Sequence, residues 1–214
     1  MNQAAAPNPF VGLRPFERAD SLYYFGRDTQ IQALLTSLHR SRFLAVVGSS
    51  GCGKSSLIRA GLIPALEAGF LVRDRDRWRI ATCKPGESPL PRLAAALLET
   101  VGQDPDPDAV TQLADRFLEE GVEVALETLG STLAGDHTNL LLLVDQFEEL
   151  FRFGQDPAGI QVATRRVEAE AFVDLLLQLA DRDRLPVYCV ITMRSDFIGD
   201  CDAFTGLPEA INRG

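Results

Sequence analysis

The stretch Gly48-Ser49-Ser50-Gly51-Cys52-Gly53-Lys54-Ser55 constrains this chain more than any other part of its sequence. It fits the pattern G-x-x-x-x-G-K-[ST] at every fixed position, and glycines in that pattern let the backbone fold tightly around phosphate oxygens. An apolar run at 43–47 precedes the stretch and a helical pattern begins near Lys54. A Gly/Ser-rich turn can match by chance, but this strand–loop–helix context favours a phosphate-binding loop.

The pattern assigns a role to each part of the loop. Backbone N–H groups and the positive end of the following helix dipole would hold the phosphates. Lys54 would reach the β- and γ-phosphates as a catalytic cation, and the Ser55 hydroxyl would bind Mg²⁺. The predicted nucleotide contacts are Gly48, Ser49, Ser50, Gly51, Cys52, Gly53, Lys54, Ser55 and Ser56.

A second element of the site follows the apolar run 140–144, which ends directly before Asp145. Ligands bind at the carboxyl ends of strands in an open parallel sheet, so Asp145 would hold Mg²⁺ there, directly or through water. Glu148 and Glu149 come one helical turn later, and either one could activate an attacking water. The alternative is that both simply favour a helix N-terminus, and the pattern does not choose between the two residues.

Two further segments are candidates for nucleotide contacts. Arg194 follows the apolar run 186–192, where its cation could contact the γ-phosphate or simply pair with Asp196 or Asp200. The segment Phe25-Gly26-Arg27 precedes a helix start, and an adenine ring can pack on such a surface. The alternative is that these aromatic residues are simply part of a core.

The remaining chain alternates buried-strand runs with helical patterns, which predicts an α/β fold with a mainly parallel sheet. The expected strands are 43–47, 78–83, 140–144 and 186–192, and the expected helices are 28–38, 54–67, 90–98, 109–133 and 165–180. We expect Pro64 to kink or end the second of these helices. Residues 1–24 are predicted to be an entry segment that packs on a nucleotide-binding domain at 25–214.

Composition excludes several other classes of protein. The 214 residues carry 30 acidic and 21 basic side chains, and a formal net charge of −9 argues against a general nucleic-acid binder. The apolar runs are far shorter than the ~20 residues of a membrane span, and the first residues do not resemble a secretory signal. Four cysteines and two histidines show no metal-ligand spacing. We therefore expect a cytoplasmic protein.

Taken together, these segments resemble the STAND class of P-loop NTPases, and in particular the novel STAND NTPase family, which is related to NACHT, NB-ARC and AAA+ ATPases. The resemblance rests on segments at 12–16, 24–28, 42–62, 144–151 and 192–197, in the expected order. It implies that Phe25, Gly26 and Arg27 line the adenine pocket, that Asp145 is the Walker B aspartate, and that Arg194 is a sensor arginine. It also implies a three-layer core of the ASCE type. Related cores have five strands in the order 5-1-4-3-2, so we expect this chain to lack the fifth strand and the C-terminal lid.

The resemblance implies a slow, Mg-ATP-dependent switch. In such proteins ATP favours an open, self-associating state and ADP a closed one, and sensors such as WD-repeat domains or effectors are attached. Gln146 replaces the glutamate that follows the aspartate in many P-loop ATPases, which indicates slow hydrolysis. Two alternatives stay open: a metabolic nucleotide or small-molecule kinase, and a domain that binds nucleotide without hydrolysing it. A neighbouring subunit could donate an arginine, with Arg14, Arg165, Arg166 and Arg213 as equal candidates.

Overall fold

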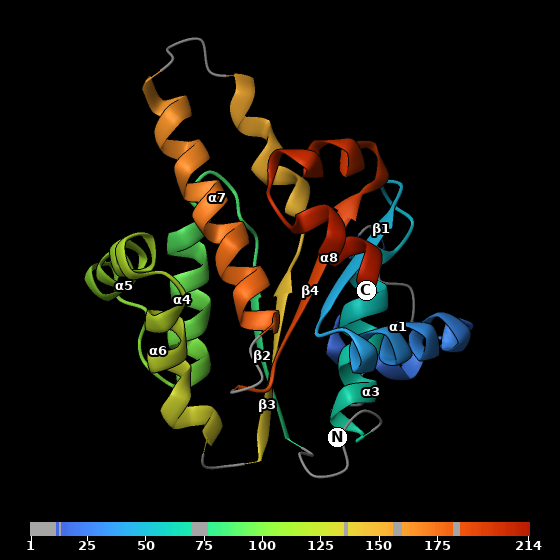
Figure 1. Ribbon diagram of the computed structural model, residues 1–214. Coiled ribbons are helices and arrows are strands. Elements are labelled where there is room, and N and C mark those ends of the chain that lie inside the picture. Colours follow the sequence, from blue (N-terminus) through green and yellow to red (C-terminus); the bar gives the residue numbers. More distant parts are fainter. Residues whose placement is uncertain (1–11, 13, 70–76, 135–136, 156–159, 182–184) are drawn as a thin grey trace, which may run out of the picture.

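Four parallel strands form the sheet at the centre of the molecule (Figure 1). In the computed structural model, which describes residues 12, 14–69, 77–134, 137–155, 160–181 and 185–214, they pair in the order β1-β4-β3-β2. Their bounds are β1 (Phe43–Gly48), β2 (Arg77–Cys83), β3 (Thr138–Val144) and β4 (Val187–Arg194). All four predicted strands are confirmed, and their order is that of strands 1, 4, 3 and 2 in the expected core.

Helices cover both faces of this sheet, so the predicted three-layer arrangement is confirmed. On one side of β3, Leu140, Leu142 and Val144 join a cluster built on α4 (Pro89–Val101), α5 (Pro107–Glu120), α6 (Val122–Ala134) and α7 (Ile160–Asp181). On the other side, Leu141 and Leu143 pack with α1 (Asp28–Arg40) and with the helix that follows the glycine-rich loop. Alternate residues of one strand therefore face opposite layers, and because both faces are covered the inner strands β3 and β4 are almost fully buried and mainly apolar.

The helix after the loop runs from Lys54 to Glu67 as α2 (Lys54–Ser56), η2 (Leu57–Leu62) and α3 (Ile63–Glu67). Of the two expected effects of Pro64, an end of the helix is wrong, because the helix continues past the proline. The helix instead widens into a π-helical turn over η2, directly before the proline, where the Ile63 amide donates to the Ile58 carbonyl. Pro64 then lies in the first turn of α3, where its missing N–H costs little, and the helix continues to Glu67.

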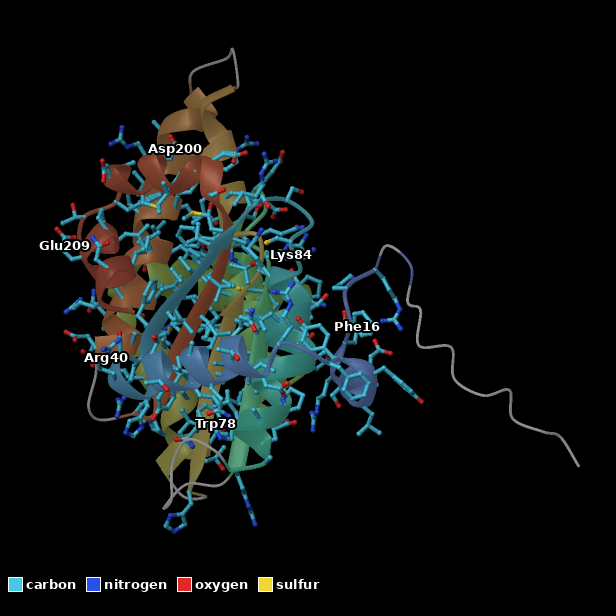
Figure 2. The ribbon with its side chains drawn as sticks, turned by 90° about the vertical axis from the view of Figure 1, so that its right-hand side faces the viewer. Phe16, Arg40, Trp78, Lys84, Asp200 and Glu209 are labelled. Carbon is cyan, nitrogen blue, oxygen red and sulfur yellow. The ribbon has the colours of Figure 1, made fainter. Side chains whose placement is uncertain are left out.

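Residues 14–24, which we call the N-terminal strap, lie against this helix. The strap contains the short helix η1 (Arg18–Tyr23), and Figure 2 shows its Phe16 beside the helix after the loop, on the same side of the molecule as Lys84. The Phe16 amide donates to Ser56 Oγ at 3.0 Å, and Arg18 pairs with Glu67 at 2.8 Å. Residues 1–11 and 13 of the predicted entry segment lie outside the described residues.

The remaining elements close the carboxyl end of the sheet. The turn η3 (Phe147–Gln155) follows β3, η4 (Ser195–Ala203) follows β4, and α8 (Leu207–Arg213) returns to contact β1. Phe151 of η3 stacks on Phe197 of η4 with ring centroids 6.0 Å apart, so the two turns hold each other. Among the described helices, none combines the length and the apolar character needed to cross a bilayer.

Candidate functional site

The loop between β1 and α2 has the backbone that its glycines predict. Gly51 and Gly53 have φ values of 74° and 90°, in the left-handed region that favours glycine. A Cβ atom on Gly48 would lie 2.8 Å from Cys52 Sγ, so a side chain at this position would force the Cys52 side chain to move. Gly51 and Gly53 thus turn the chain, and Gly48 leaves room for the side chain of Cys52.

The side chain of Lys54 folds back over the first residues of this loop. Its Nζ donates to the carbonyl oxygens of Gly48 and Ser49, both at 2.9 Å. The ammonium group is therefore tied to the backbone that would surround a phosphate group. A phosphate that enters the loop would take over this cation, because an anionic oxygen is a stronger acceptor than a neutral carbonyl.

Asp145, at the carboxyl end of β3, is the most heavily bonded side chain of the site. Its Oδ1 accepts hydrogen bonds from Ser55 Oγ at 2.9 Å and from Thr192 Oγ1 at 2.6 Å. Its Oδ2 accepts from Arg59 Nη2 at 2.9 Å. Only 2% of this residue is exposed, so the structure brings Ser55 and Asp145, the two predicted metal ligands, together in a buried position.

The surroundings of Asp145 favour its charged form. Burial raises the pKa of this carboxyl, but the hydrogen bonds from Thr192 and Ser55 and the positive charges of Arg59 and Lys84 lower it by more. The net pKa therefore lies below its ordinary value, and Asp145 is an anion at neutral pH.

The turn after Asp145 is strained. Gln146 has a φ of 60°, a left-handed conformation that costs a residue with a Cβ atom about 1–2 kcal/mol. Its amide donates to Thr192 Oγ1 at 3.0 Å, so the Thr192 hydroxyl accepts from Gln146 and donates to Asp145. Such strain persists where surrounding contacts enforce it, and here it redirects the chain into η3.

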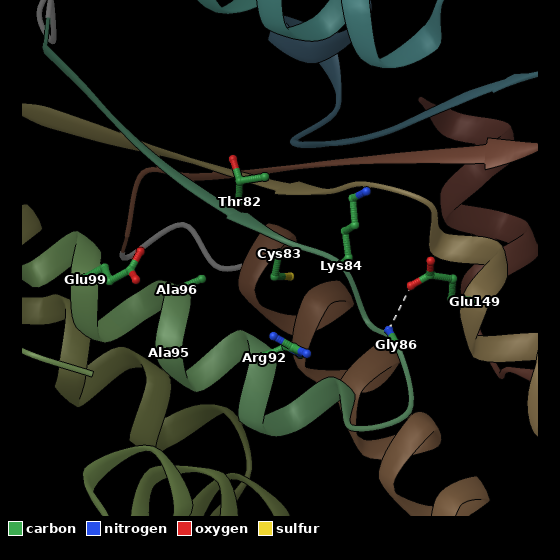
Figure 3. Close-up of a pocket in the computed structure, with 9 residues that line it drawn as sticks. All are labelled: Thr82, Cys83, Lys84, Gly86, Arg92, Ala95, Ala96, Glu99 and Glu149. Atoms are coloured by element: carbon green, nitrogen blue, oxygen red, sulfur yellow. Dashed lines mark hydrogen bonds between the residues drawn. The ribbon is translucent and has the colours of Figure 1, made fainter. Parts of the chain in front are cut away.

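The structure separates the two glutamates that the sequence leaves equivalent. Glu148 is 6% exposed, lines the same cavity as Lys54 and Asp145, and accepts a hydrogen bond from the Arg194 amide at 3.3 Å. Glu149 points elsewhere and accepts from the Gly86 amide at 3.0 Å, as the dashed line in Figure 3 shows. Glu148 is therefore available to the site, whereas Glu149 holds the segment that follows β2.

Arg194 lines the cavity from the end of β4, but its guanidinium already has partners. It forms an ion pair with Asp196, which is one of the two alternatives that its position left open. Its Cζ also lies 5.6 Å from the centroid of the Phe197 ring. Contact with a γ-phosphate would require this guanidinium to leave or share Asp196.

These residues line one cavity of about 740 Å³, which we call the loop cavity. Although the chain is acidic overall, basic side chains outnumber acidic ones around this cavity by five to three. The basic residues are Arg14, Lys54, Arg59, Lys84 and Arg194, and the acidic residues are Glu17, Asp145 and Glu148. A polyanion such as a nucleoside triphosphate matches this local charge.

A second cavity of about 450 Å³ lies at the end of β2, and we call it the β2 pocket (Figure 3). Lys84 and Glu149 line it together with Arg92 and Glu99 of α4. In Figure 3 the side chain of Lys84 points away from Arg92. The two basic residues of the β2 pocket are thus matched by two acidic ones.

A model of the family described as Novel STAND NTPase 1 matches residues 9–214 of the chain. The chain belongs to this family. The fold of the chain is also similar to that of a distant solved structure. No match is found among curated proteins.

Three solved structures are among those similar to this chain. A structure titled as the HORMA:CdnC:Trip13 complex of E. coli MS115-1 has 16% identity and a TM-score of 0.50, over 95% of this chain and 68% of that one. A Walker-type ATPase of Pyrococcus abyssi has 18% identity and a TM-score of 0.47, over 90% and 51%. The conjugation coupling protein TcpA of pCW3, solved with ATPγS, has 18% identity and a TM-score of 0.37, over 73% and 43%. This chain spans about half the length of the Pyrococcus protein.

The donor set of the STAND site suits a magnesium ion that shares its coordination with phosphates. A hydroxyl and a carboxylate oxygen, from Ser55 and Asp145, are hard donors of the kind that Mg²⁺ prefers. Within the described residues, no three His, Cys, Asp or Glu side chains are grouped to hold a metal. Mg²⁺ usually binds through one or two protein ligands together with waters and substrate phosphates, and this arrangement fits that pattern.

The predicted adenine segment of the STAND domain does not line the loop cavity. Phe25 is 80% exposed, and Arg27 lies at the N-terminus of α1, where its carbonyl accepts from the Ile31 amide. Gly48, Ser49 and Cys52 belong to the loop but are not among the residues that line this cavity. The assignment of Phe25, Gly26 and Arg27 to adenine stays a prediction.

Sequence reasoning did not identify Thr192, Arg59, Lys84 and Glu17 as residues of the STAND site, although all four line the loop cavity. Arg59 carried a usable signal, because it follows Ser55 by four positions and so shares its helix face. Thr192 precedes Arg194 by two positions on a strand and so lies on the same face of the sheet. Glu17 carried no comparable signal.

The four cysteines of the chain are all free, and three of them are buried. Burial raises the pKa of Cys83 to about 12, and it also raises the pKa of Cys189. Burial and the nearby Asp200 and Asp202 raise the pKa of Cys201 to about 11. Cys52, on the glycine loop, is exposed.

Proposed function

We propose that this STAND NTPase chain binds Mg-ATP in the loop cavity and hydrolyses it slowly, as a nucleotide-dependent switch. The observation that carries the proposal is the Ser55–Asp145 hydroxyl–carboxylate pair, 2.9 Å apart, beside a glycine loop covered by Lys54. This is the combination of phosphate cradle, cation and metal ligands that phosphoryl transfer from a nucleoside triphosphate requires.

Each residue has a defined part in this reaction. The loop amides and Lys54 would bind the phosphates, and Ser55 and Asp145 would hold Mg²⁺, which neutralises charge on the phosphate oxygens when it is bound. Glu148 would orient or deprotonate the attacking water. Its burial in the loop cavity supports this role, while the bond from Gly86 to Glu149 argues for a structural role of its neighbour.

Two features support slow turnover. Gln146 occupies the position directly after Asp145 and cannot serve as a general base. The Arg194 guanidinium is paired with Asp196, so it must give up or share that partner before it can stabilise charge on the γ-phosphate. Slow hydrolysis would give the ATP state a lifetime long enough to act as a signal.

The switch role itself rests on membership of the STAND family. In this proposal the ATP state self-associates, and sensor or effector domains, such as WD-repeat domains, respond to it. The domain boundary at residues 24 and 25 and the cytoplasmic location belong to the same proposal. The four free cysteines support a reducing compartment.

The test compares Lys54→Ala with Arg92→Ala, which removes a basic residue from the β2 pocket only. We expect denatured wild-type protein to release bound adenine nucleotide, and we expect turnover below about 1 s⁻¹, at the slow end of enzyme rates. Lys54→Ala should weaken ATP binding about 10- to 100-fold, because a charged hydrogen bond is worth roughly 1.5–3 kcal/mol. Arg92→Ala should bind ATP like wild type.

Other outcomes would replace this proposal. Equal ATP binding by wild type and Lys54→Ala would show that the loop is not the phosphate site. Turnover that requires a small-molecule acceptor would identify a kinase instead. ATP binding without any hydrolysis would support the other alternative, a domain that binds nucleotide but is not an enzyme.

A further inference from the structure

Arg59 joins the predicted metal site to the N-terminal strap. Its Nη2 donates to Asp145 Oδ2 at 2.9 Å, and its Nη1 donates to Glu17 Oε1 at 2.7 Å. The Arg59 side chain is 21% exposed, and its Nε is buried without a hydrogen-bond partner among the described residues. One guanidinium therefore bridges two carboxylates, one in the core and one on the strap.

The strap also forms one wall of the loop cavity. Arg14, Pro15, Phe16 and Glu17 all line it. The Phe16 amide donates to the hydroxyl of Ser56, directly after the predicted metal ligand, and two hydrogen bonds to Asp20 hold the Arg14 side chain. The strap thus contacts the site at Ser56 and, through Arg59, at Asp145.

Arg59 and a magnesium ion would act on the same carboxylate. Asp145 is almost fully buried, where charges interact strongly, and each of the two cations reduces the negative charge that attracts the other. Glu17 partly neutralises Arg59 and so moderates this competition. Two ligands that oppose each other at one group are linked reciprocally, so each weakens the other by the same factor.

We propose that Arg59 is a positioning residue that competes with Mg²⁺ for Asp145 and thereby couples the strap to the nucleotide state. The inference rests on the proposed function, since it requires Mg-ATP in the loop cavity. In the state described here, Arg59 holds Asp145 and anchors the strap through Glu17. Binding of Mg-ATP weakens the Arg59–Asp145 pair and leaves the guanidinium to Glu17, so the strap is held more tightly, and a docked strap in turn raises the affinity for Mg²⁺.

The mechanism predicts shifts of opposite sign for the two partners of the bridge. Arg59→Gln removes the competing cation, so the Mg²⁺ concentration for half-saturation should fall about five-fold or more. Glu17→Gln leaves the charge of Arg59 less compensated, so this concentration should rise about two-fold. Arg59→Lys keeps the charge and should lie between wild type and Arg59→Gln. A general loss of structure would move all three variants in the same direction.

The measurement is a Mg²⁺ titration at pH 8 with a saturating fluorescent ATP analogue, which reports nucleotide binding. Hydrogen exchange of residues 14–24 is followed in parallel, with the analogue in EDTA and with the analogue in Mg²⁺. Wild type should exchange more slowly in this segment with Mg²⁺, and Arg59→Gln should exchange fast in both. The matched control is Arg116→Gln, because Arg116 also bridges two carboxylates, Glu120 and Glu127, but lies outside the loop cavity.

Different results would overturn the proposed function and the inference about Arg59. If wild type does not bind the analogue at any Mg²⁺ concentration, the proposed function is wrong and the inference falls with it. If wild type binds but Arg59→Gln titrates like Arg116→Gln, the inference alone is wrong. A higher half-saturation in Arg59→Gln would mean that Arg59 assists Mg²⁺ binding, which also overturns the inference.

Discussion

The loop cavity and the β2 pocket lie side by side at the carboxyl edge of one sheet, and Lys84 lines both. The loop cavity has a glycine loop, a buried aspartate and an excess of basic side chains. The β2 pocket has two basic and two acidic side chains and no such loop. The edge of a parallel sheet thus supplies cavities, but a phosphate site also requires backbone that can close around an anion.

Glu148 and Glu149 form the boundary between the two cavities. They are neighbours in one 3₁₀ turn, anchored by the buried Phe147 before them and Leu150 after them. Because the turn directs successive side chains to different sides, one carboxylate enters the loop cavity and the other reaches Gly86. If this boundary holds, substitutions that face the loop cavity change ATP turnover, and substitutions that face the β2 pocket change stability alone.

The largest expected effect is that of Asp145→Asn. Removal of the charge takes away the anionic oxygen of the predicted metal ligand and leaves Arg59, among the described residues, with Glu17 as its charged partner. We expect ATP turnover to fall about 100-fold or more, measured by phosphate release at saturating Mg²⁺. Glu99→Gln, the corresponding change in the β2 pocket, should leave turnover within about two-fold of wild type. Equal losses in both variants would contradict the distinction between the cavities.

The second effect separates the two glutamates. Glu148→Gln should lower turnover about 100-fold, because general-base catalysis typically contributes 10²- to 10⁴-fold, while ATP binding stays within about three-fold. Glu149→Gln should change turnover less than about three-fold. The assay is turnover together with ATP binding for both variants. A reversed order would place the catalytic carboxylate at the β2 pocket.

A smaller effect concerns the stability of the segment after β2. Glu149→Ala removes the acceptor of the Gly86 amide, and a hydrogen bond of this kind contributes about 1 kcal/mol to the free energy of unfolding. We expect Tm to fall by about 2–4 °C in thermal unfolding. Glu87→Ala, an exposed glutamate of the same segment, should change Tm much less. Equal shifts would show that Glu149 does not anchor the segment.

The smallest effect is a pH dependence of stability that Asp145 contributes. The pKa of this carboxyl is lower in the folded protein than its ordinary value, so the folded state binds its proton less readily than the unfolded state. The resulting stability is present above about pH 4 and is lost as the pH falls through the folded pKa. Urea unfolding at pH 6 and pH 3.5 should show a larger loss for wild type than for Asp145→Asn. Parallel losses would argue against the ionised, hydrogen-bonded aspartate.

The strands and the loop could be predicted because their signals are local. The runs 43–47 and 140–144 are continuous and apolar since both faces of the sheet are covered, and their ends place Lys54 and Asp145 at one edge. The glycine loop is recognisable for a similar reason, because its backbone conformation depends on residues within the loop itself.

The contacts around Asp145 could not be predicted in the same way. Arg59 and Asp145 are 86 positions apart, and Thr192 and Asp145 are 47 apart, so only the packed fold brings them together. The different roles of Glu148 and Glu149 depend on the direction of a short turn, which no periodic pattern encodes. The π-helical turn before Pro64 likewise depends on how this helix satisfies its hydrogen bonds.

The distribution of the cysteines allows selective chemical labelling of the protein at one native thiol. Cys52 is exposed on the glycine loop, whereas the other three thiols are buried and have raised pKa values. A thiol reagent that reacts through the thiolate should therefore label the folded protein at Cys52 first. Because Cys52 Sγ lies 4.0 Å from Lys54 Nζ, a reporter group placed there would stand at the entrance to the loop without any engineered residue.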